Sequence, residues 1–583
     1  MIWKSRVLAI EKKAVARSGF FDAAWYFATY PDAAADGSEA LDHFVRLGRA
    51  ELRSPGPRFN ARQYAEDYPD IGLFGHDPLM HYLNFGMHEG RRAKSHDGRH
   101  ELIEFVPPRP MRPHRQLSHL TRIGLARENL ISCFEEWAFK WEFRSFNVLG
   151  KHAFLCNSPE SVQFAFSTHN ASFESKTPEM RYALQPLLGD GLFVSDGATW
   201  RQRRRIIAPI VHMSRLPDYA PLMIEAALET RRRWAQLGEG ATIDVLAEMG
   251  HLTAETICRT IFGQALGRES AVAIVAAFSR YQNVASYIDI ASLLGVPDYI
   301  GRWHSQAVRR EAQVIKDLVD GIINRVRSGA GGLETSMVRS LIDARDPETG
   351  APLDDEAIRN EAVVLFMAGY ETTASSLAWA WYLLSQAPDV EARLQAEIDN
   401  LIGAREPKLA DVGNLVFTRA VFEETLRLYP PVPFLSRQAS RDETFQGERI
   451  PKGSRLYIIP WLLHRHRHLW KKPDHFIPDR FLPGSPEPVS KFAYVPFSIG
   501  PRVCPGMSFG LTEAMLCIAT LSQRFQLRLP KGHRVEAHCR LTLRPGEQLH
   551  MELQKRSPSL RRPGDAVIAP AALNVATCPF HHE

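Results

Sequence analysis

The chain has 583 residues, of which 45% are apolar, and this is enough for one large domain and a smaller unit. Its 71 basic and 66 acidic residues give a net charge of +5, and this balance gives no support to nucleic-acid binding, which needs a concentrated basic face. The seven cysteines are scattered, odd in number and without zinc-type spacing, so we expect no disulfide framework and a reducing compartment.

The N-terminal stretch, MIWKSRVLAIEKKAVARSGF, is basic and amphipathic. It is too polar for the hydrophobic part of a signal peptide or for a membrane span. No other stretch reaches spanning length without a charge or a proline. We therefore expect a soluble, cytoplasmic protein without a membrane span.

Residues 1–106 contain an internal repeat with a period of 38 residues and no gap. A strict period of this size indicates a tandem supersecondary unit. In each copy, aromatic residues four or five apart predict a short helix that ends at Pro-Asp. The segment ALDHFVRLG predicts a second helix with Gly48 as its C-terminal cap, so we expect a small module of two helical hairpins. The recurring pairs are Phe21/Phe59, Tyr26/Tyr64, Tyr30/Tyr68, Pro31/Pro69, Asp32/Asp70, Leu41/Leu79, His43/His81, Gly48/Gly86, Glu51/Glu89 and Arg53/Arg91.

Three further segments complete the expected organisation. Residues 107–115 are dense in proline and predict a stiff linker. Residues 116–556 alternate long helical patterns with a few short strands, which predicts a mainly α domain with small β-sheets. Residues 557–583 are rich in Pro, Ala and Arg and predict a disordered tail. The tail contains Cys578, His581 and His582, and we favour a disordered end over a metal site there.

The stretch from Asp355 to Gln386 predicts one helix of about 32 residues, which Pro388 ends. Its apolar middle should run through the core and contains the segment AGYETT, residues 368–373. Glycine and threonine are unfavourable in a buried helix, and a buried glutamate needs a partner. Such local cost indicates function. The alternative is an ordinary core helix with small residues at a helix crossing.

The segment FSIGPRVCPG, residues 497–506, precedes a strong helical pattern. Pro505 suits the first helical position, so Cys504 is predicted at a helix N-terminus, where backbone N–H groups favour a thiolate. Gly500 and Gly506 would let the backbone approach a flat ring, and Arg502 can pair with a carboxylate at the edge of that ring. The alternative is a buried structural cysteine in a Gly/Pro loop.

These motifs resemble the cytochrome P-450 family over about residues 116–555. The family's heme loop has Phe, Gly, Arg, Cys and Gly at the spacing found here, and its oxygen-binding helix reads Ala/Gly-Gly-x-Asp/Glu-Thr-Thr/Ser. The resemblance implies the P-450 fold, here preceded by the repeat module, with heme b held by Cys504. Tyr370 departs from the residues that many relatives have, which we expect to reshape the pocket near the iron.

The resemblance also assigns roles. In the oxygen-binding helix, Thr372 would bond to the bound dioxygen, Glu371 would deliver protons, and Ala368 and Gly369 would leave space above the iron. The residues implied to hold the heme are Cys504, Arg502, Phe497, Gly500, Gly506, Arg437, Trp200 and Arg204. A buried network that supports the cysteine loop would consist of Glu424, Arg427 and Arg480.

Three other segments carry predictions of their own. The arginines at 201, 203, 204 and 205 should mostly form a solvated face, on the side where the family docks acidic electron donors. The segment from His464 to His468, HRHRH, predicts surface structure rather than a metal site. The segment from Thr542 to Gly546 resembles the hairpin that closes the family's substrate pocket.

The resemblance implies a monooxygenase that inserts one oxygen atom from O2 into a small lipophilic substrate. A ferredoxin- or flavodoxin-type donor with its reductase would supply the electrons, since no flavin or iron–sulfur segment follows the heme domain. Two alternatives remain: a heme-thiolate peroxygenase or isomerase, and a heme-based binding or sensing protein. The pair Glu371 and Thr372 argues against the first, because those reactions do not need a proton relay.

Overall fold

The chain forms two compact units. One contains Met1–Met111 together with Asp474–Phe476 and Leu529–Ala537, and the other contains the remaining residues. The sequence-based boundary at residue 106 did not include the two short later segments. The computed structural model describes residues 11–556 apart from 74–76, 88, 90, 92, 94, 96–104, 115, 149–150, 264–272, 279, 282–303, 329–335, 487–488 and 541. The predicted tail, with Cys578, His581 and His582, lies outside the described residues.

The smaller unit contains both copies of the 38-residue repeat. The elements of the first copy are α2 (Ala23–Thr29), α3 (Pro31–Ala35), α4 (Ala40–His43) and the π-helical segment η1 (Phe44–Gly48). Those of the second copy are α5 (Ala61–Asp67), α6 (Asp70–Leu73), α7 (Pro78–His81) and η2 (Tyr82–Gly86). In each copy a buried tyrosine contacts a buried histidine: the Tyr26 hydroxyl lies 3.1 Å from His43 Nδ1, and the Tyr64 hydroxyl lies 3.2 Å from His81 Nδ1.

The repeated glycines have a packing role. Gly48 is not the C-terminal cap that we predicted; it lies inside the π-helical segment η1, and Arg49 is the cap. A Cβ at Gly48 would lie 2.2 Å from the Tyr26 hydroxyl, and one at Gly86 would lie 2.1 Å from the Tyr64 hydroxyl. Each glycine therefore leaves room for the tyrosine that holds its copy together.

The same Arg–Asp ion pair occurs in both copies of the repeat. Arg53 Nη1 donates to Asp32 at 3.0 Å, and Arg91 Nη1 donates to Asp70 at 2.8 Å. Each arginine also lies over an aromatic ring of its own copy, Tyr30 or Tyr68. The positions that recur in the sequence are thus those that make the contacts within each copy.

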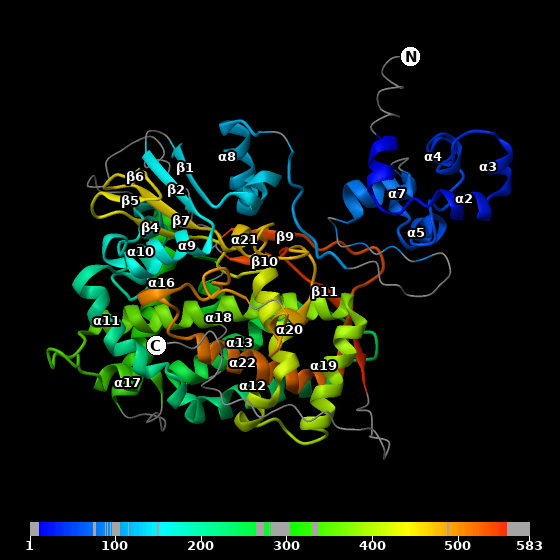
Figure 1. Cartoon of the computed structure of the whole chain (residues 1–583). Helices are drawn as coiled ribbons and strands as arrows, with labels where there is room; N and C mark the ends of the chain where they lie inside the picture. Colours follow the sequence, from blue (N-terminus) through cyan, green and yellow to red (C-terminus); the bar gives the residue numbers. More distant parts are fainter. Residues whose placement is uncertain are drawn as a thin grey trace. The chain divides into compact units, whose positions relative to one another are not determined.

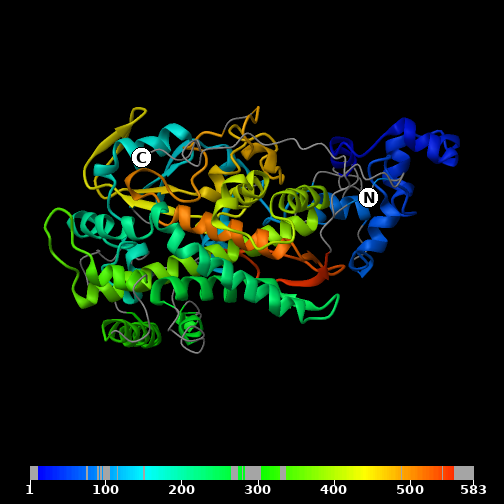
Figure 2. The same ribbon diagram turned by 90° about the horizontal axis from the view of Figure 1, so that it is seen from below.

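The larger unit is mainly α-helical. Its helices are α8 (His119–Glu128), α9 (Pro159–Gln163), α10 (Pro178–Leu188), α11 (Gly197–Ile210), α12 (Leu216–Ala235), α13 (Val245–Phe262), α16 (Gln306–Arg327), α17 (Met337–Asp343), α18 (Asp355–Gln386), α19 (Pro388–Leu401), α20 (Val416–Leu428), α21 (Pro460–Leu463) and α22 (Met507–Ser522). Figure 1 shows α18 running through this unit, and Figure 2 shows α22 in orange in the middle of the helices. No helix among the described residues is long and apolar enough to cross a membrane.

Helix α18 has the bounds that the sequence predicts, Asp355–Gln386. The Asp354 side chain caps it by accepting from the Ala357 N–H at 2.7 Å, and Pro388 begins the next helix. Its middle is buried against the largest hydrophobic cluster of the unit, to which α10–α13, α16, α17 and α22 also contribute. The longest helix of the described chain therefore forms the centre of the core.

Short strands form four small sheets. The strands are β1 (Phe143–Val148), β2 (Lys151–Cys156), β3 (Thr242–Asp244), β4 (Leu435–Gln438), β5 (Glu443–Phe445), β6 (Glu448–Ile450), β7 (Arg455–Ile458), β8 (Phe525–Arg528), β9 (Ala537–Cys539), β10 (Leu543–Pro545) and β11 (His550–Lys555). The largest sheet has the order β1-β2-β7-β4, with β2 and β7 parallel and the other pairs antiparallel. The remaining sheets pair β3-β11-β8, β10-β9 and β5-β6. The predicted fold class, mainly α with small β-sheets, is thus confirmed.

We propose that the larger unit folds without the repeat module, because the large core cluster begins at Leu184 and the module has a cluster of its own between Val15 and Ala93. A chain that begins at His114 is therefore expected to show cooperative thermal unfolding and the helical circular dichroism of the larger unit. If this chain lacks a cooperative transition that the full-length protein shows, the module belongs to the same folding unit and the proposed boundary is wrong.

Candidate active site

The middle of α18 is uncovered at one point. Ala368 is exposed, although the neighbouring turns, including Phe366 and Met367, are buried. The Thr372 hydroxyl donates to the Ala368 carbonyl at 2.7 Å, and the Ser376 hydroxyl donates to the Thr372 carbonyl at 2.7 Å. Such side-chain hydrogen bonds loosen the regular backbone ladder of a helix. A helix in the core therefore presents an accessible stretch from Ala368 to Thr372.

Gly369 and Tyr370, which follow Ala368 in α18, contact another helix. A Cβ at Gly369 would lie 2.7 Å from Ile257 Cδ1 of α13, so this glycine lets the two helices approach. The Tyr370 ring stacks on Phe366 at 5.7 Å, and the Tyr370 carbonyl accepts from the Thr253 hydroxyl at 3.1 Å. Packing between α18 and α13 thus explains why a glycine and a tyrosine occupy positions 369 and 370. The space above the iron that we assigned to Gly369, and the reshaped pocket at Tyr370, stay predictions.

The cysteine loop is a tight turn before α22. The Cys504 N–H donates to the Phe497 carbonyl at 2.8 Å, and Gly500–Arg502 form a 3₁₀ turn between them. Helix α22 begins at Met507 with Gly506 as its N-cap, so Pro505 is not the first helical residue that we predicted. Cys504 nevertheless lies just before the N-terminus of this helix.

Gly500 is required by the backbone. Its φ is +71°, and a Cβ there would lie 1.9 Å from the Phe166 carbonyl oxygen. We expected this glycine to allow a flat ring to approach, but the close neighbour is the chain itself. Gly506 is different, since a Cβ there would lie 3.9 Å from Cys504 Sγ, at ordinary contact distance.

The surroundings of Cys504 both raise and lower the pKa of its thiol. Burial raises the pKa of Cys504, whereas the Gly506 N–H and the Arg204 guanidinium lower it. Arg204 is held in place because its Nη1 donates to the Val503 carbonyl at 2.7 Å. A metal ion bound to the sulfur would add to the two lowering effects and favour the thiolate.

Three buried cations lie close to one another beside the loop. Burial, and then the charge of Arg502, lower the pKa of Arg437 to about 9. Burial lowers the pKa of Arg502 to about 10, and the pKa of Lys176 falls well below its usual value through burial and the charges of Arg437 and Arg502. Among the described residues, Arg437 Nε and Arg502 Nε are buried without a hydrogen-bond partner. Mutually repelling buried cations with unpaired donors fit a bound anionic group.

The elements that place these cations are distinct. Strand β4 carries Arg437, and the guanidinium of Arg502 lies 4.4 Å above the buried ring of Trp200 in α11. Arg502 also donates to the Asp196 carboxylate at 2.8 Å. Lys176 precedes α10, and we did not single it out from the sequence. A lone lysine in ESKTP carries no motif, so only the tertiary structure reveals it.

The ion pair of Glu424 and Arg427 is fully buried in α20. Arg427 Nε and Nη2 donate to the two carboxylate oxygens of Glu424 at 2.6 and 2.7 Å. Arg480 lies 3.5 Å from Glu424, and its Nη2 donates to the Lys471 carbonyl. The structure therefore brings the three residues of the predicted network together.

The network reaches the cysteine loop through His464. Arg427 Nη1 donates to the His464 carbonyl at 2.8 Å, and His464 Nε2 accepts from the Val495 N–H at 2.9 Å, two residues before Phe497. Burial and the charges of Arg427 and Arg465 keep the pKa of His464 well below its usual value, so the ring is neutral. The prediction of surface structure for this segment is wrong, because its first three residues are buried.

The arginine run on α11 also differs from our expectation of a mostly solvated face. Only Arg201 is exposed. Arg203 lies 3.5 Å from the buried carboxylate of Glu361, and Arg205 donates to Asp346 at 2.8 Å. These arginines join α11 to its neighbours.

The described part of the chain contains no group of three or more His, Cys, Asp or Glu side chains that could hold a metal ion.

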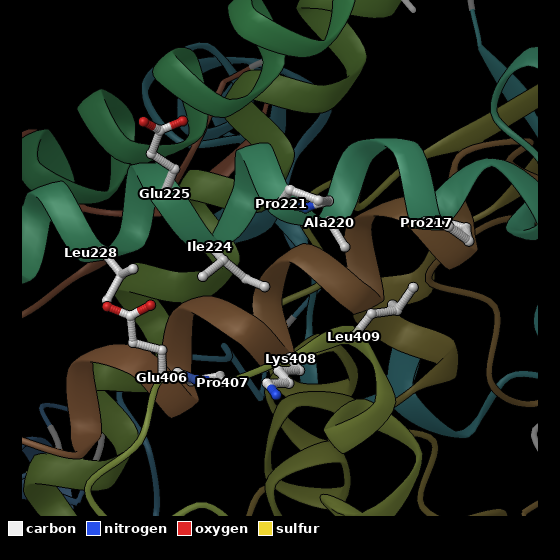
Figure 3. A pocket seen from close by; sticks show the side chains of 10 residues that line it. All are labelled: Pro217, Ala220, Pro221, Ile224, Glu225, Leu228, Glu406, Pro407, Lys408 and Leu409. Atoms are coloured by element: carbon white, nitrogen blue, oxygen red, sulfur yellow. The ribbon is translucent and has the colours of Figure 1, made fainter.

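A cavity of about 630 Å³ lies elsewhere, between α12 and residues 406–409 (Figure 3). Its walls are mostly apolar, with Ile224, Leu228 and Pro407 among them, and Glu225 and Lys408 supply charges. None of the residues that line it belongs to α18 or to the cysteine loop. This cavity is therefore not part of the candidate site.

Comparison with known proteins identifies the family. A model of the cytochrome P450 family matches residues 108–549. Cyclooctatin synthase of Streptomyces melanosporofaciens is 34% identical over 67% of this chain and 83% of its own length. Cyclooctat-9-en-7-ol 5-monooxygenase of the same organism is 31% identical over 59% and 74%. The crystal structure of the cytochrome P450DA heme domain has a TM-score of 0.65 at 26% identity and covers 78% of this chain and 99% of its own. The chain therefore belongs to the cytochrome P450 family.

Membership fixes the class of cofactor and reaction. The chain is a monooxygenase whose cofactor is heme with an axial cysteine thiolate. The site fits this cofactor, because a cysteine at the start of α22 would hold the iron and the buried cations would hold the two propionates. The accessible stretch from Ala368 to Thr372 leaves one face of α18 open for a bound group.

Gly500→Ala tests the geometry of the loop. A methyl group would overlap the Phe166 carbonyl and strain φ, so we expect the variant to bind heme poorly, measured as heme absorbance per protein. Gly453→Ala is the matched control, since Gly453 also has a positive φ, +85°, but nothing lies within 4 Å of its Cβ position. Equal heme content in the two variants would show that the contact with Phe166 does not shape the site.

Proposed function

We propose that Cys504 is the axial ligand of the heme and that this monooxygenase hydroxylates a lipophilic substrate. The observation that carries the proposal is the half-buried Cys504 in the loop before α22, on a chain of the cytochrome P450 family. The same loop carries Arg502, which is one of the three neighbouring buried cations Lys176, Arg437 and Arg502. Trp200 and Arg204 on α11 complete the set of residues that would hold the heme.

The relatives suggest the substrate class. One of them is by name a monooxygenase of a cyclic alkenol, cyclooctat-9-en-7-ol. A bulky hydrocarbon with few polar groups suits a site that binds by burial of apolar surface. Cyclic alkenols are therefore the first class to test, and fatty acids the second. Binding of a substrate from either class is expected to shift the absorption of the heme-loaded protein.

Electrons must come from a reductant, which in our proposal is a ferredoxin- or flavodoxin-type protein with its reductase, acting in the cytoplasm. The bifunctional cytochrome P450/NADPH--P450 reductase 1 of Bacillus subtilis is 31% identical to this chain, and the match covers 63% of this chain and 35% of the relative. An acidic donor would contact Arg201 on α11, which is exposed and also pairs with Glu174.

The residues of α18 would handle protons. Heme, when bound through a thiolate, supplies the activation of dioxygen. We assign the Thr372 hydroxyl to hold a hydrogen bond at the oxygen site, since it lies on the accessible stretch of α18; a hydroxyl that donates to the Ala368 carbonyl can still accept a second hydrogen bond. The Glu371 carboxyl, its neighbour, would take protons from solvent and pass them inward.

Thr372→Ala tests these roles. The variant is expected to bind heme and substrate as before but to form hydrogen peroxide instead of product, because groups that transfer protons typically contribute about 10²–10⁴-fold. The measurement is product formed per NADPH consumed, with ¹⁸O2 as the oxygen source and a surrogate ferredoxin and reductase. Thr373→Ala, at a neighbouring buried position of the same helix, is the control. Unchanged coupling in Thr372→Ala would remove this hydroxyl from the mechanism, and turnover that needs only peroxide would favour a peroxygenase.

A further inference from the structure

The carboxyl group of Glu371 has a partner outside its own helix. The Thr542 hydroxyl donates to Glu371 Oε1 at 2.5 Å, although the two residues are 171 positions apart in the chain. Thr542 is buried, and Glu371 is half-buried. Hydrogen bonds from a neutral donor to a carboxylate are shorter and stronger than those between neutral groups. This contact therefore restricts where the Glu371 carboxylate can lie.

The backbone next to Thr542 is held independently of Glu371. Thr542 directly precedes β10, where the Leu543 N–H donates to the Pro431 carbonyl at 3.1 Å. The Leu543 carbonyl accepts from Trp379 Nε1 at 3.3 Å. Trp379 is a residue of α18, so the strand is attached to the same helix that carries Glu371.

The attachment point is itself rigid. The rings of Trp379 and Tyr429 stack with centroids 3.5 Å apart and planes 1° from parallel, and Trp379 is fully buried. The hydrogen bonds to Pro431 and Trp379 therefore fix the backbone at Leu543, which is the first residue of β10. The fold therefore sets the backbone from which the Thr542 hydroxyl reaches the Glu371 carboxylate.

We propose that Thr542 is a positioning residue that holds the Glu371 carboxylate for proton delivery, an inference that rests on the role proposed for Glu371. A carboxylate that receives a proton and passes it on must occupy a defined position, because proton transfer requires hydrogen-bond distances. Thr372, the next residue, has its own hydroxyl engaged with the Ala368 carbonyl. Thr542 thus keeps Glu371 from rotating freely, and its loss lets the side chain adopt positions in which no proton is delivered.

Thr542→Val and Thr542→Ser separate the hydroxyl from the shape of the side chain. Valine keeps the branched shape without the hydroxyl, whereas serine keeps the hydroxyl. In the heme-loaded full-length protein we expect Thr542→Val to lower kcat and product per NADPH about tenfold, less than the loss of a proton-transfer group itself. KM and the substrate-induced shift of the heme absorption should stay unchanged, and Thr542→Ser should restore coupling. Crystal structures should show Glu371 in its original position in the serine variant and displaced in the valine variant.

Glu371→Gln provides the reference for the proposed function. If Glu371→Gln leaves coupling unchanged, the role of Glu371 fails, and the inference about Thr542 fails with it. If Glu371→Gln uncouples the enzyme but Thr542→Val does not, only the inference is overturned. Thr542→Val placed in the Glu371→Gln background should have no further effect. An additional loss there, or a raised KM that serine does not restore, would mean that Thr542 acts on the substrate pocket and not through Glu371.

Discussion

The rest of the site depends on the buried ion pair of Glu424 and Arg427. Both side chains are fully buried, so removal of either partner would leave an uncompensated charge in the core, which typically costs about 3–5 kcal/mol. The remaining donors of Arg427 bind the carbonyls of His464 and Pro473, and the His464 ring accepts from Val495 just before the cysteine loop. One ion pair in α20 thus connects three later segments of the chain, the last of which ends two residues before Phe497 of the cysteine loop.

The candidate heme site contains buried positive charges, an arrangement that is unfavourable for folding by itself. Arg437 and Arg502 are buried, repel each other and have lowered pKa values. Such an arrangement costs stability without an anion and is relieved when the carboxylates of a cofactor bind. The cations therefore couple heme binding to the stability of the larger unit. Helix α18 shows a related feature, since the hydroxyls of Thr372 and Ser376 donate to backbone carbonyls beside the accessible stretch from Ala368 to Thr372.

Sequence reasoning reached those parts of the structure that local signals encode. The bounds of α18 were predictable because Pro388 and the polar start of the helix are local, and the cysteine loop because its spacing is contiguous. Tertiary contacts escaped prediction. Lys176 belongs to no motif, the burial of His464 depends on Arg427, and the need for glycine at position 500 comes from the distant Phe166 carbonyl. The bond between Thr542 and Glu371 joins segments that no sequence pattern relates.

The central claim, that Cys504 holds the heme iron, is tested most directly by the absorption spectrum of the reduced protein with carbon monoxide. The full-length protein should show the red-shifted band of thiolate-ligated heme. Cys504→Ala should lose this band, and Cys517→Ala should keep it, because Cys517 lies buried in α22 away from the start of the helix. A red-shifted band that persists in Cys504→Ala would contradict the account.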